Sequence, residues 1–235
     1  MNMLVAAILL GTLSAAGAAN VDNDHNDKKV RWELPADVLG TSNQISFNQK
    51  AGGAWYFMEG TSLVHDPVTY QFLPQYFALC PSPTPMAGLA CWGEAVDPAN
   101  PFGTYPQVGI NFYDHSVTDS GTGVHPAHSM TFHPLGTRLA IIAWRSPGDY
   151  TIDIKGEIRS LYPTLPCGDG VRWTVEQGTV VLASGDTSVS ASPAINLKNL
   201  QVEKGDAIYL IADPKDNNTC DSTLVSVVIT ARDDK

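Results

Sequence analysis

An apolar run in the middle of the chain constrains the fold more than any other stretch. Leu139 to Trp144 reads LAIIAW, which is too short for a buried helix and long enough for a strand covered on both faces. A Ser-Pro-Gly-Asp turn follows at residues 146–149, and residues 150–155 then alternate between apolar and polar side chains, the pattern of a half-buried strand. We predict that these two strands form a hairpin.

Short strand patterns recur along most of the chain. They cover residues 43–57, 70–79, 107–112, 171–183, 194–202, 207–213 and 222–231, with hairpin turns expected at Gln177-Gly178 and at Lys204-Gly205-Asp206. Residues 80–106 are rich in Pro and Gly and predict a long loop, and residues 113–134 predict an irregular segment. No amphipathic helical segment of convincing length interrupts this pattern. We therefore predict an all-β protein, an antiparallel β-sandwich of the jelly-roll type.

The first residues have the pattern of an export signal. Residues 1–19 contain an apolar core followed by small residues, a segment that is too short to span a bilayer and is typical of a secretory signal peptide. We expect residues 20–38 to form a flexible lead-in and residues 39–235 to form a single β-sandwich domain. The protein is then secreted, to the extracellular space or the periplasm.

The charge of the chain narrows the choice of partners. The formal net charge is −10, and the acidic residues are spread along the sequence. Such a surface repels phosphate backbones and anionic lipids, which argues against nucleic-acid binding and membrane-surface binding. It also argues against a strongly polyanionic glycan, unless the fold creates a local basic cleft.

Four cysteines in an exported chain indicate two disulfides, for which three pairings are possible. We favour Cys80–Cys91, which would pin the Pro-rich loop, and Cys167–Cys220, which would tie a mid-chain loop to the end of the domain. The cysteine spacing matches neither zinc sites nor redox motifs, so these residues are expected to be structural.

Aromatic residues outside the predicted core are the first candidate ligand-binding groups. Sugar rings present apolar C–H faces that stack on Trp and Tyr rings whose polar tips stay in water. Trp144 and Trp173 lie within strands and are expected in the core. The candidate ligand-binding residues lie on predicted strand edges and loops, where core packing is the alternative for the two tryptophans: Trp55, Tyr56, Trp92 and Tyr113.

A histidine-rich segment is the second candidate. Four histidines fall within residues 115–133, beside Asp114 and Asp119. Histidine with a carboxylate can bind metals or transfer protons near neutral pH, although the H-x-x-H spacing here does not lie on a helix. The alternative is that the histidines anchor the loop through hydrogen bonds. The candidate catalytic residues are His125, His128, His133 and Tyr113.

Four short motifs resemble those of exported bacterial β-sandwich domains similar to carbohydrate-binding modules. The motifs are Gly53-Ala54-Trp55-Tyr56, His133-Pro134 leading to Trp144-Arg145-Ser146-Pro147, Gly168-Asp169-Gly170-Val171, and Lys204-Gly205-Asp206 before a strand that ends near 217–223. The resemblance covers most of residues 43–229. It implies a jelly-roll fold and a glycan partner, but it does not specify the ligand.

The resemblance also suggests a structural calcium ion, since such modules often hold one. Calcium needs six to eight oxygen ligands. A Cys167–Cys220 disulfide would draw together the candidate ligands Asp169, Asp216, Asn217 and Asp221. The alternative is that these residues only form turns.

Three functions remain open. The sequence has no nucleophile elbow, and it does not pair Glu59, Glu94 or Glu157 with another carboxylate. We therefore favour a secreted, non-catalytic glycan-binding protein. The alternatives are a polysaccharide-acting enzyme, such as a lyase in which a histidine and Tyr113 act as base and acid, and a structural envelope or assembly protein.

Overall fold

Two antiparallel β-sheets packed face to face form the domain. The computed structural model describes residues 29–39, 53–81, 89–94, 105–119, 123–162, 167–187 and 194–232. Within these ranges every strand pairing is antiparallel. The predicted fold class, an all-β antiparallel sandwich, is therefore confirmed.

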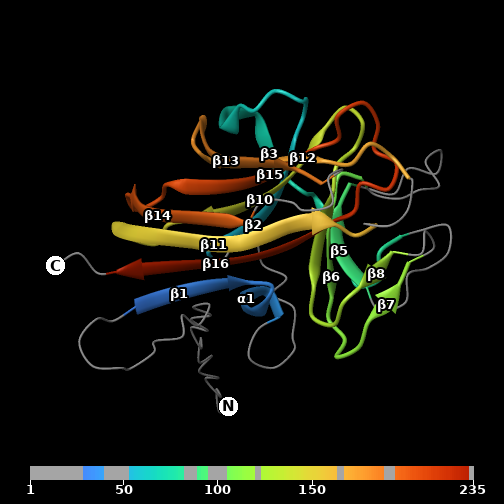
Figure 1. Cartoon of the computed structure of the whole chain (residues 1–235), viewed down its shortest axis with the longest axis horizontal. Coiled ribbons are helices and arrows are strands. Elements are labelled where there is room, and N and C mark those ends of the chain that lie inside the picture. The colour runs from blue at the N-terminus through green and yellow to red at the C-terminus, as the bar shows by residue number, and fades with distance from the viewer. Residues whose placement is uncertain are drawn as a thin grey trace, which may run out of the picture.

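The first sheet, which we call sheet A, has the described strand order β14-β11-β16-β9-β6-β5-β4, with β1 paired to β16 beside β9. Its strands are β1 (Lys29–Leu34), β4 (Gln75–Phe77), β5 (Leu89–Gly93), β6 (Gln107–Asn111), β9 (Met130–His133), β11 (Tyr150–Ser160), β14 (Ile195–Val202) and β16 (Thr223–Arg232). Figure 1 shows β14, β11, β16 and β1 side by side, with strands of the second sheet above them.

The second sheet, sheet B, has the described order β13-β12-β15-β10-β2-β3. Its strands are β2 (Trp55–Gly60), β3 (Tyr70–Phe72), β10 (Leu139–Arg145), β12 (Arg172–Gln177), β13 (Val180–Asp186) and β15 (Ala207–Asp213). The small elements are β7 (Val117–Thr118) paired with β8 (Val124–His125), the helix α1 (Ala36–Leu39) and the 3₁₀ turn η1 (Pro67–Thr69). In the part of the chain that the structure describes, no helix is long and apolar enough to cross a membrane.

The main core lies between the two sheets and is rich in tryptophan. Trp144 and Trp173 are 0% and 1% exposed, which confirms the prediction that they belong to the core. The Trp144 ring lies 5.0 Å from the ring of Trp32, and the Phe57 ring lies 4.4 Å from that of Trp92. Rings at these distances pack edge-on or tilted and add to the free energy gained from apolar burial.

Strand β10 is buried on both faces, as its apolar run predicts. Ala140, Ile142 and Trp144 pack in the main core, whereas Leu139 and Ile141 belong to a second, smaller cluster. Since successive residues of a strand point to opposite faces, the second cluster must lie on the outer face of sheet B. The outer face of this sheet is therefore partly covered.

Two predicted hairpins are wrong, because the connected strands lie in different sheets. β10 pairs with β2 and β15, whereas β11 pairs with β14 and β16, so residues 146–149 carry the chain from sheet B to sheet A. Residues 203–206 likewise connect β14 of sheet A to β15 of sheet B. The two turns support each other: the Ser146 amide donates to the Asp206 carbonyl (2.8 Å) and the Gly205 amide to the Ser146 carbonyl (2.8 Å). The third predicted hairpin, β12–β13, is confirmed.

The predicted flexible lead-in at residues 20–38 is corrected from Lys29 onward. Residues 29–34 pair with β16 over the whole of β1, and Trp32 and Leu34 enter the core. Their apolar alternation explains the added strand. The expected loop at 80–106 contains the fully buried strand β5, and the expected irregular segment at 113–134 contains β9. The predicted signal peptide at 1–19 lies outside the described residues.

Two disulfides join the cysteine pairs that the sequence favours. Cys80 is bonded to Cys91 and Cys167 to Cys220, with Cα–Cα distances of 5.4 and 5.8 Å, which lie in the usual range. The first bond crosses from the end of β4 to β5. The second fixes the segment before β12 against the segment before β16.

A glycine allows a close contact between β11 and β16 in sheet A and supplies a test of the fold. A Cβ atom on Gly156 of β11 would collide with the backbone oxygen of Ser226 and with Val227 of β16. We expect Gly156→Ala to lower the free energy of unfolding by about 1–3 kcal/mol, the usual cost of overpacking. Denaturant unfolding measures this change. Lys155→Ala, at the exposed neighbouring position, is the control, and equal stability of the two variants would contradict the close packing.

Candidate functional site

The outer face of sheet B carries a group of aromatic side chains. In β2, Trp55 and Phe57 enter the main core, while Tyr56 and Met58 alternate with them along the strand and are only partly buried. Successive strand residues point to opposite faces, so Tyr56 and Met58 project from the outer face. Trp55 and Tyr56 therefore cannot belong to one binding surface, although the sequence prediction grouped them.

Three neighbouring strands place two tyrosines on either side of an alanine. Ala143 of β10 pairs with Tyr56 of β2 and with Tyr209 of β15. Directly paired residues of neighbouring strands share a face, and strands are spaced about 4.8 Å apart, so the two tyrosines leave the sheet roughly 10 Å from each other. The side chain between them is only a methyl group.

Two further aromatic residues extend this row across β3. The ring of Phe72 lies 5.8 Å from that of Tyr56, at an interplanar angle of 41°, and Phe72 is 43% exposed. The ring of Tyr70 meets the Tyr209 ring edge to face at 5.2 Å. Tyr56 and Tyr209 are partly buried, so they keep part of their surface in water while the strands fix their orientation.

An arginine completes the group. Arg145 lies at the end of β10, two residues after Ala143 and on the same face, and its guanidinium carbon is 5.7 Å from the centre of the Tyr56 ring. A guanidinium at this distance over a ring makes a cation–π contact. The side chain is exposed. We call Tyr56, Phe72, Tyr209 and Arg145 the aromatic face.

A small second core supports the aromatic face from within the sheet. It consists of Leu139, Ile141, Ile211 and Tyr70, with Met58 and Tyr209 packed against it. Buried neighbours restrict the rotamers of Tyr209, since interiors are packed as densely as organic crystals. The Tyr209 ring thus stands on a rigid base, and Tyr56 and Phe72 are held on the paired strands β2 and β3.

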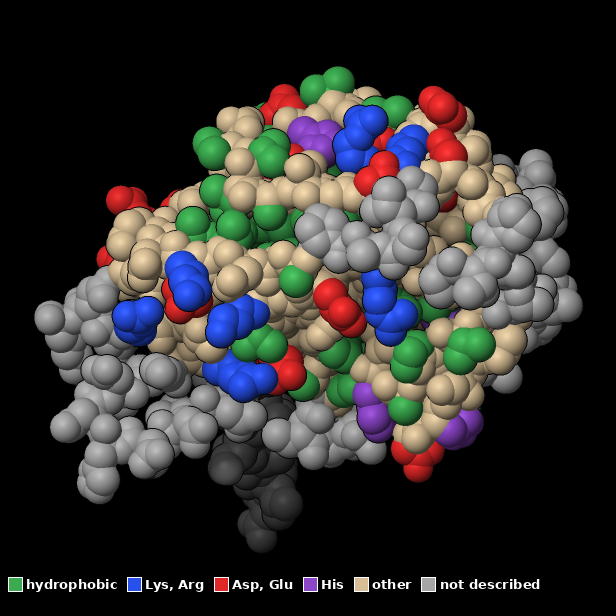
Figure 2. Space-filling view, in the orientation of Figure 1, with side chains coloured by type: hydrophobic (Ala, Val, Ile, Leu, Met, Phe, Trp, Pro, Cys, Tyr) green, Lys and Arg blue, Asp and Glu red, His purple; other side chains and the backbone are tan. Residues whose placement is uncertain are grey.

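The connection from β2 to β3 covers one side of this second core. His65 Nδ1 lies 2.6 Å from Oε1 of Glu176, a buried side chain that also accepts from the Thr174 hydroxyl at 2.7 Å. Figure 2 shows hydrophobic side chains at the top of the molecule. In the β2–β3 connection, Val64 and Val68 are 66% and 92% exposed.

Two of the predicted sugar-binding residues are corrected, because they are core residues. Trp55 is 8% exposed, and its indole Nε1 donates to Asp37 Oδ2 at 3.0 Å. Trp92 is 2% exposed and its ring lies between those of Phe57 and Tyr76, at 4.4 and 5.2 Å. Neither ring offers a face to a ligand.

Tyr113, the remaining predicted residue, is exposed but lies apart from the aromatic face. It follows β6 of sheet A, and its ring stacks on that of His115 with centroids 5.0 Å apart and planes 14° apart. Of the four predicted aromatic residues, Tyr56 and Tyr113 are accessible, and Tyr56 lies in sheet B whereas Tyr113 lies in the segment that follows β6 of sheet A. Phe72, Tyr209 and Arg145 were missed. Strand alternation from Tyr56 could have indicated the face, but the pairing of β2, β10 and β15 is not visible in the sequence.

The four predicted catalytic residues do not converge. His125 is 4% exposed and its Nε2 lies 3.3 Å from Asp119, whose carboxylate also accepts from the Tyr162 hydroxyl at 2.6 Å. His133 is buried, its Nδ1 lies 2.7 Å from the Pro134 carbonyl, and burial lowers the pKa of its ring to about 4. These contacts match the alternative in which the histidines anchor the segment.

His128 lines a pocket on sheet A. Its neighbours in this cavity of about 180 Å³ include Pro35, Glu157 and Arg159, and Arg159 already pairs with Glu157 at 3.3 Å. Neither Tyr113 nor His125 lines it. An acid and a base for a lyase reaction are therefore not brought together in this pocket.

Two glutamates that the sequence left unpaired meet through an arginine. Arg138 donates to Glu59 Oε2 at 3.0 Å and to Glu94 Oε1 at 2.7 Å. Burial, followed by the hydrogen bond with Glu94, raises the pKa of Glu59 to about 7. This cluster ties the end of β2 in sheet B to the end of β5 in sheet A. The residues are too far apart in sequence for any local pattern to reveal the contact.

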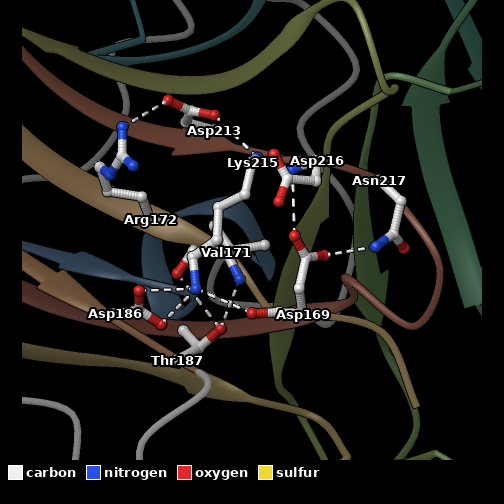
Figure 3. A network of polar contacts seen from close by, with 9 residues as sticks. All are labelled: Asp169, Val171, Arg172, Asp186, Thr187, Asp213, Lys215, Asp216 and Asn217. Carbon is white, nitrogen blue, oxygen red and sulfur yellow. Dashed lines mark hydrogen bonds and ion pairs between the residues drawn. The ribbon is translucent and has the colours of Figure 1, made fainter.

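The predicted calcium ligands do meet, beside the Cys167–Cys220 bond, but the side-chain oxygens of Asp169 and Asn217 already accept hydrogen bonds from the protein. Asp169 accepts from the Asp216 amide at 3.0 Å and from Asn217 Nδ2 at 2.7 Å (Figure 3). The ammonium of Lys215 donates to the Asp169 carbonyl at 2.8 Å and bonds the carboxylate of Asp186. A protein cation thus already occupies this polar network.

Asp221 is the exception in this set. It is 1% exposed, and within the described residues neither carboxylate oxygen has a hydrogen-bond partner. Burial and then the charge of Asp169 raise the pKa of this carboxyl to about 8. Among the described residues no group of three or more His, Cys, Asp or Glu side chains could hold a metal ion. The four residues therefore do not fit a calcium site with six to eight oxygen ligands.

Comparisons with known proteins give structural neighbours that include carbohydrate-binding modules. No family model matches the chain, and no curated protein matches it either. The similar solved structures include a Clostridium perfringens ZmpB fragment whose CBM51 domain is in complex with GlcNAc, at 18% identity and a TM-score of 0.33. That match covers 50% of this chain and 25% of the other.

Two further neighbours are single carbohydrate-binding modules. One is the C-terminal CBM6 of LamC, a laminarinase from Zobellia galactanivorans, at 12% identity and a TM-score of 0.26. The other is a CBM36 in complex with calcium and xylotriose, at 13% identity and a TM-score of 0.27. Each match covers 49% of this chain, and 86% and 87% of the respective module.

The unpaired carboxyl of Asp221 predicts a pH-dependent stability. Because its pKa is raised from 3.8 to about 8, the folded protein binds this proton more tightly than the unfolded chain. The contribution of the protonated Asp221 carboxyl to the free energy of unfolding is therefore full below about pH 4, and it is lost as the pH rises toward 8. We expect Asp221→Asn to be more stable than the parent at pH 8, by about 1–3 kcal/mol, and to lose this advantage near pH 4.

Thermal unfolding across this pH range measures the effect. Asp216→Asn is the matched control, because it makes the same change at an exposed neighbouring carboxylate. An Asp221→Asn protein that is less stable than the parent at pH 8 would contradict an unpaired buried carboxyl.

Proposed function

We propose that this protein is a secreted, non-catalytic carbohydrate-binding protein and that the aromatic face of sheet B is its binding surface. The observation that carries the proposal is the placement of Tyr56 and Tyr209 on either side of Ala143, with Phe72 beside Tyr56. Flat rings at a fixed spacing, with their polar tips near water, suit the apolar C–H faces of pyranose sugars.

The rigidity of the surface favours binding. The rings lie on paired strands, and Tyr209 also packs against the second core, so little side-chain entropy is lost when a ligand binds. A short flat row also suits an extended glycan chain better than a small molecule, which would need an enclosed pocket.

Export is part of the proposal and has its own support. The apolar segment at residues 1–19 has the features of a signal peptide. The two disulfides in a chain of this length are typical of proteins that work in an oxidising compartment. We place the protein outside the cell or in the periplasm.

The two alternative functions have less support in the geometry. A lyase needs an acid and a base at one sugar, whereas the predicted histidines and Tyr113 lie in separate environments. An assembly protein needs a broad apolar contact surface. Exposed aliphatic side chains do occur at Val64, Val68, Val180 and Val181, but nothing on these segments indicates what would cover them.

Alanine substitution on the aromatic face tests the proposal. We expect the mature protein to bind one or more polysaccharides on a glycan array. Tyr56→Ala and Phe72→Ala should each weaken binding roughly tenfold, because each removes a stacking ring. Isothermal titration calorimetry with the strongest glycan of the array measures the loss.

Tyr113→Ala is the control, since it removes an exposed aromatic ring on the other sheet. If Tyr113→Ala abolishes binding and Tyr56→Ala does not, the binding surface is misplaced. If no glycan binds the parent protein, the proposed function is wrong.

A structural calcium ion does not form part of this proposal, because the residues near Asp221 do not offer a calcium shell. We expect neither added calcium nor a chelator to change the midpoint of thermal unfolding. A rise of the midpoint with calcium that disappears in Asp221→Asn would show that the side chains rearrange around an ion, and it would overturn this expectation.

A further inference from the structure

We propose that the aromatic face recognises a carboxylated sugar, such as a uronic acid residue of a polysaccharide, and that Arg145 binds its carboxylate. This inference rests on the proposed function, because it names the class of glycan that the same surface takes. The main observation behind it is that Arg145 forms no ion pair within the described residues.

Arg145 differs from the other arginines that the structure describes. Each of the others pairs with one or more carboxylates, at distances between 2.7 and 3.5 Å. The paired arginines are Arg31, Arg138, Arg159, Arg172 and Arg232. Arg145 makes no ion pair or side-chain hydrogen bond within the described residues, and its packing contact is with the ring of Tyr56. An acidic protein that pairs every other described arginine thus leaves this one available.

The stacking contact prepares Arg145 to bind a planar anion. A guanidinium that packs over a ring keeps its N–H donors at the periphery, where they can bind both oxygens of a carboxylate. Because Arg145 lies two residues beyond Ala143 on the same face, its donors border the Tyr56–Ala143–Tyr209 row. A sugar ring stacked on Tyr56 would present an equatorial carboxylate to these donors.

The acidic residues in the two turns next to Arg145 already accept hydrogen bonds from backbone amides. The two turns that follow β10 and precede β15 carry Asp149 and Asp206. Asp149 accepts from the Lys204 amide at 2.7 Å, and Asp206 accepts from the Glu203 amide at 3.0 Å. Backbone donors thus hold these carboxylates, and within the described residues neither forms an ion pair with Arg145.

The overall charge limits the ligand further. At a net charge of −10 the protein repels a densely charged polyanion, and the aromatic face supplies a single arginine. One guanidinium over flat rings suits one carboxylate per bound sugar, as in a polyuronate, better than a heavily sulfated chain. An anionic ligand requires a basic group on the binding surface, and the aromatic face provides one such group, Arg145.

Matched acidic and neutral glycans test this inference. The probes are oligosaccharides of polygalacturonate, alginate and hyaluronan, each compared with its own methyl ester, which keeps the sugar ring and removes the charge. We expect the parent protein to bind one or more of the acids roughly tenfold or more tightly than the ester by calorimetry. Added salt should weaken binding of the acid and not of the ester.

Three variants separate the roles of charge and ring. Arg145→Gln should reduce binding of the acid to the level of the ester and leave the ester unchanged. Arg145→Lys should restore binding only in part, because an ammonium lacks the planar fork. Arg159→Gln, which removes an exposed arginine from sheet A, is the matched control and should bind like the parent. Unfolding midpoints confirm that each variant is folded.

The possible failures are distinguishable. Equal binding of acid and ester, or an unchanged preference in Arg145→Gln, would overturn the carboxylate inference and leave the proposed function standing. If only neutral glycans bind the parent protein and Tyr56→Ala no longer binds them, the carboxylate inference is likewise overturned and the proposed function stands. If Tyr56→Ala binds every glycan as the parent does, the proposed function itself fails.

Discussion

The burial of β10 on both faces is the constraint on which the rest of this structure depends. Its inner residues, which include Ile142 and Trp144, fill the core between the sheets, and its outer residues Leu139 and Ile141 form the base of a second cluster. A strand with two buried faces must be central, so β2 and β15 pair on either side of it. This arrangement places Tyr56, Ala143 and Tyr209 in one row, with Arg145 at its end.

The sequence predicts the features that neighbouring residues determine. It does not predict the features that depend on contacts between segments far apart in the chain. The apolar run of β10, the alternation in β11 and the two core tryptophans are local patterns, and the structure confirms them. The tight turns at 146–149 and 203–206 are also local, but whether the next strand joins the same sheet depends on the core. For that reason the turns were expected to form hairpins, whereas they carry the chain between the sheets.

The candidate site shows the same division. Trp55 and Tyr56 are neighbours in sequence, and strand alternation separates them onto the core face and the outer face. Tyr209 and Arg145 join Tyr56 only through strand pairing, which no local pattern gives. The histidines and the aspartates near Cys220 were identified as polar clusters. Their hydrogen bonds to Asp119, to backbone carbonyls and to Lys215 show that most of them stabilise loops.

The most direct test of a binding surface on sheet B is an NMR titration of the ¹⁵N-labelled mature protein with the glycan that binds best on an array. If the aromatic face is the binding surface, the amide shifts that change will cluster on the outer residues of β2, β3, β10 and β15, around Tyr56, Phe72 and Tyr209. Shifts confined to the segment around Tyr113 and His128, or no shifts at a saturating glycan concentration, would contradict the account.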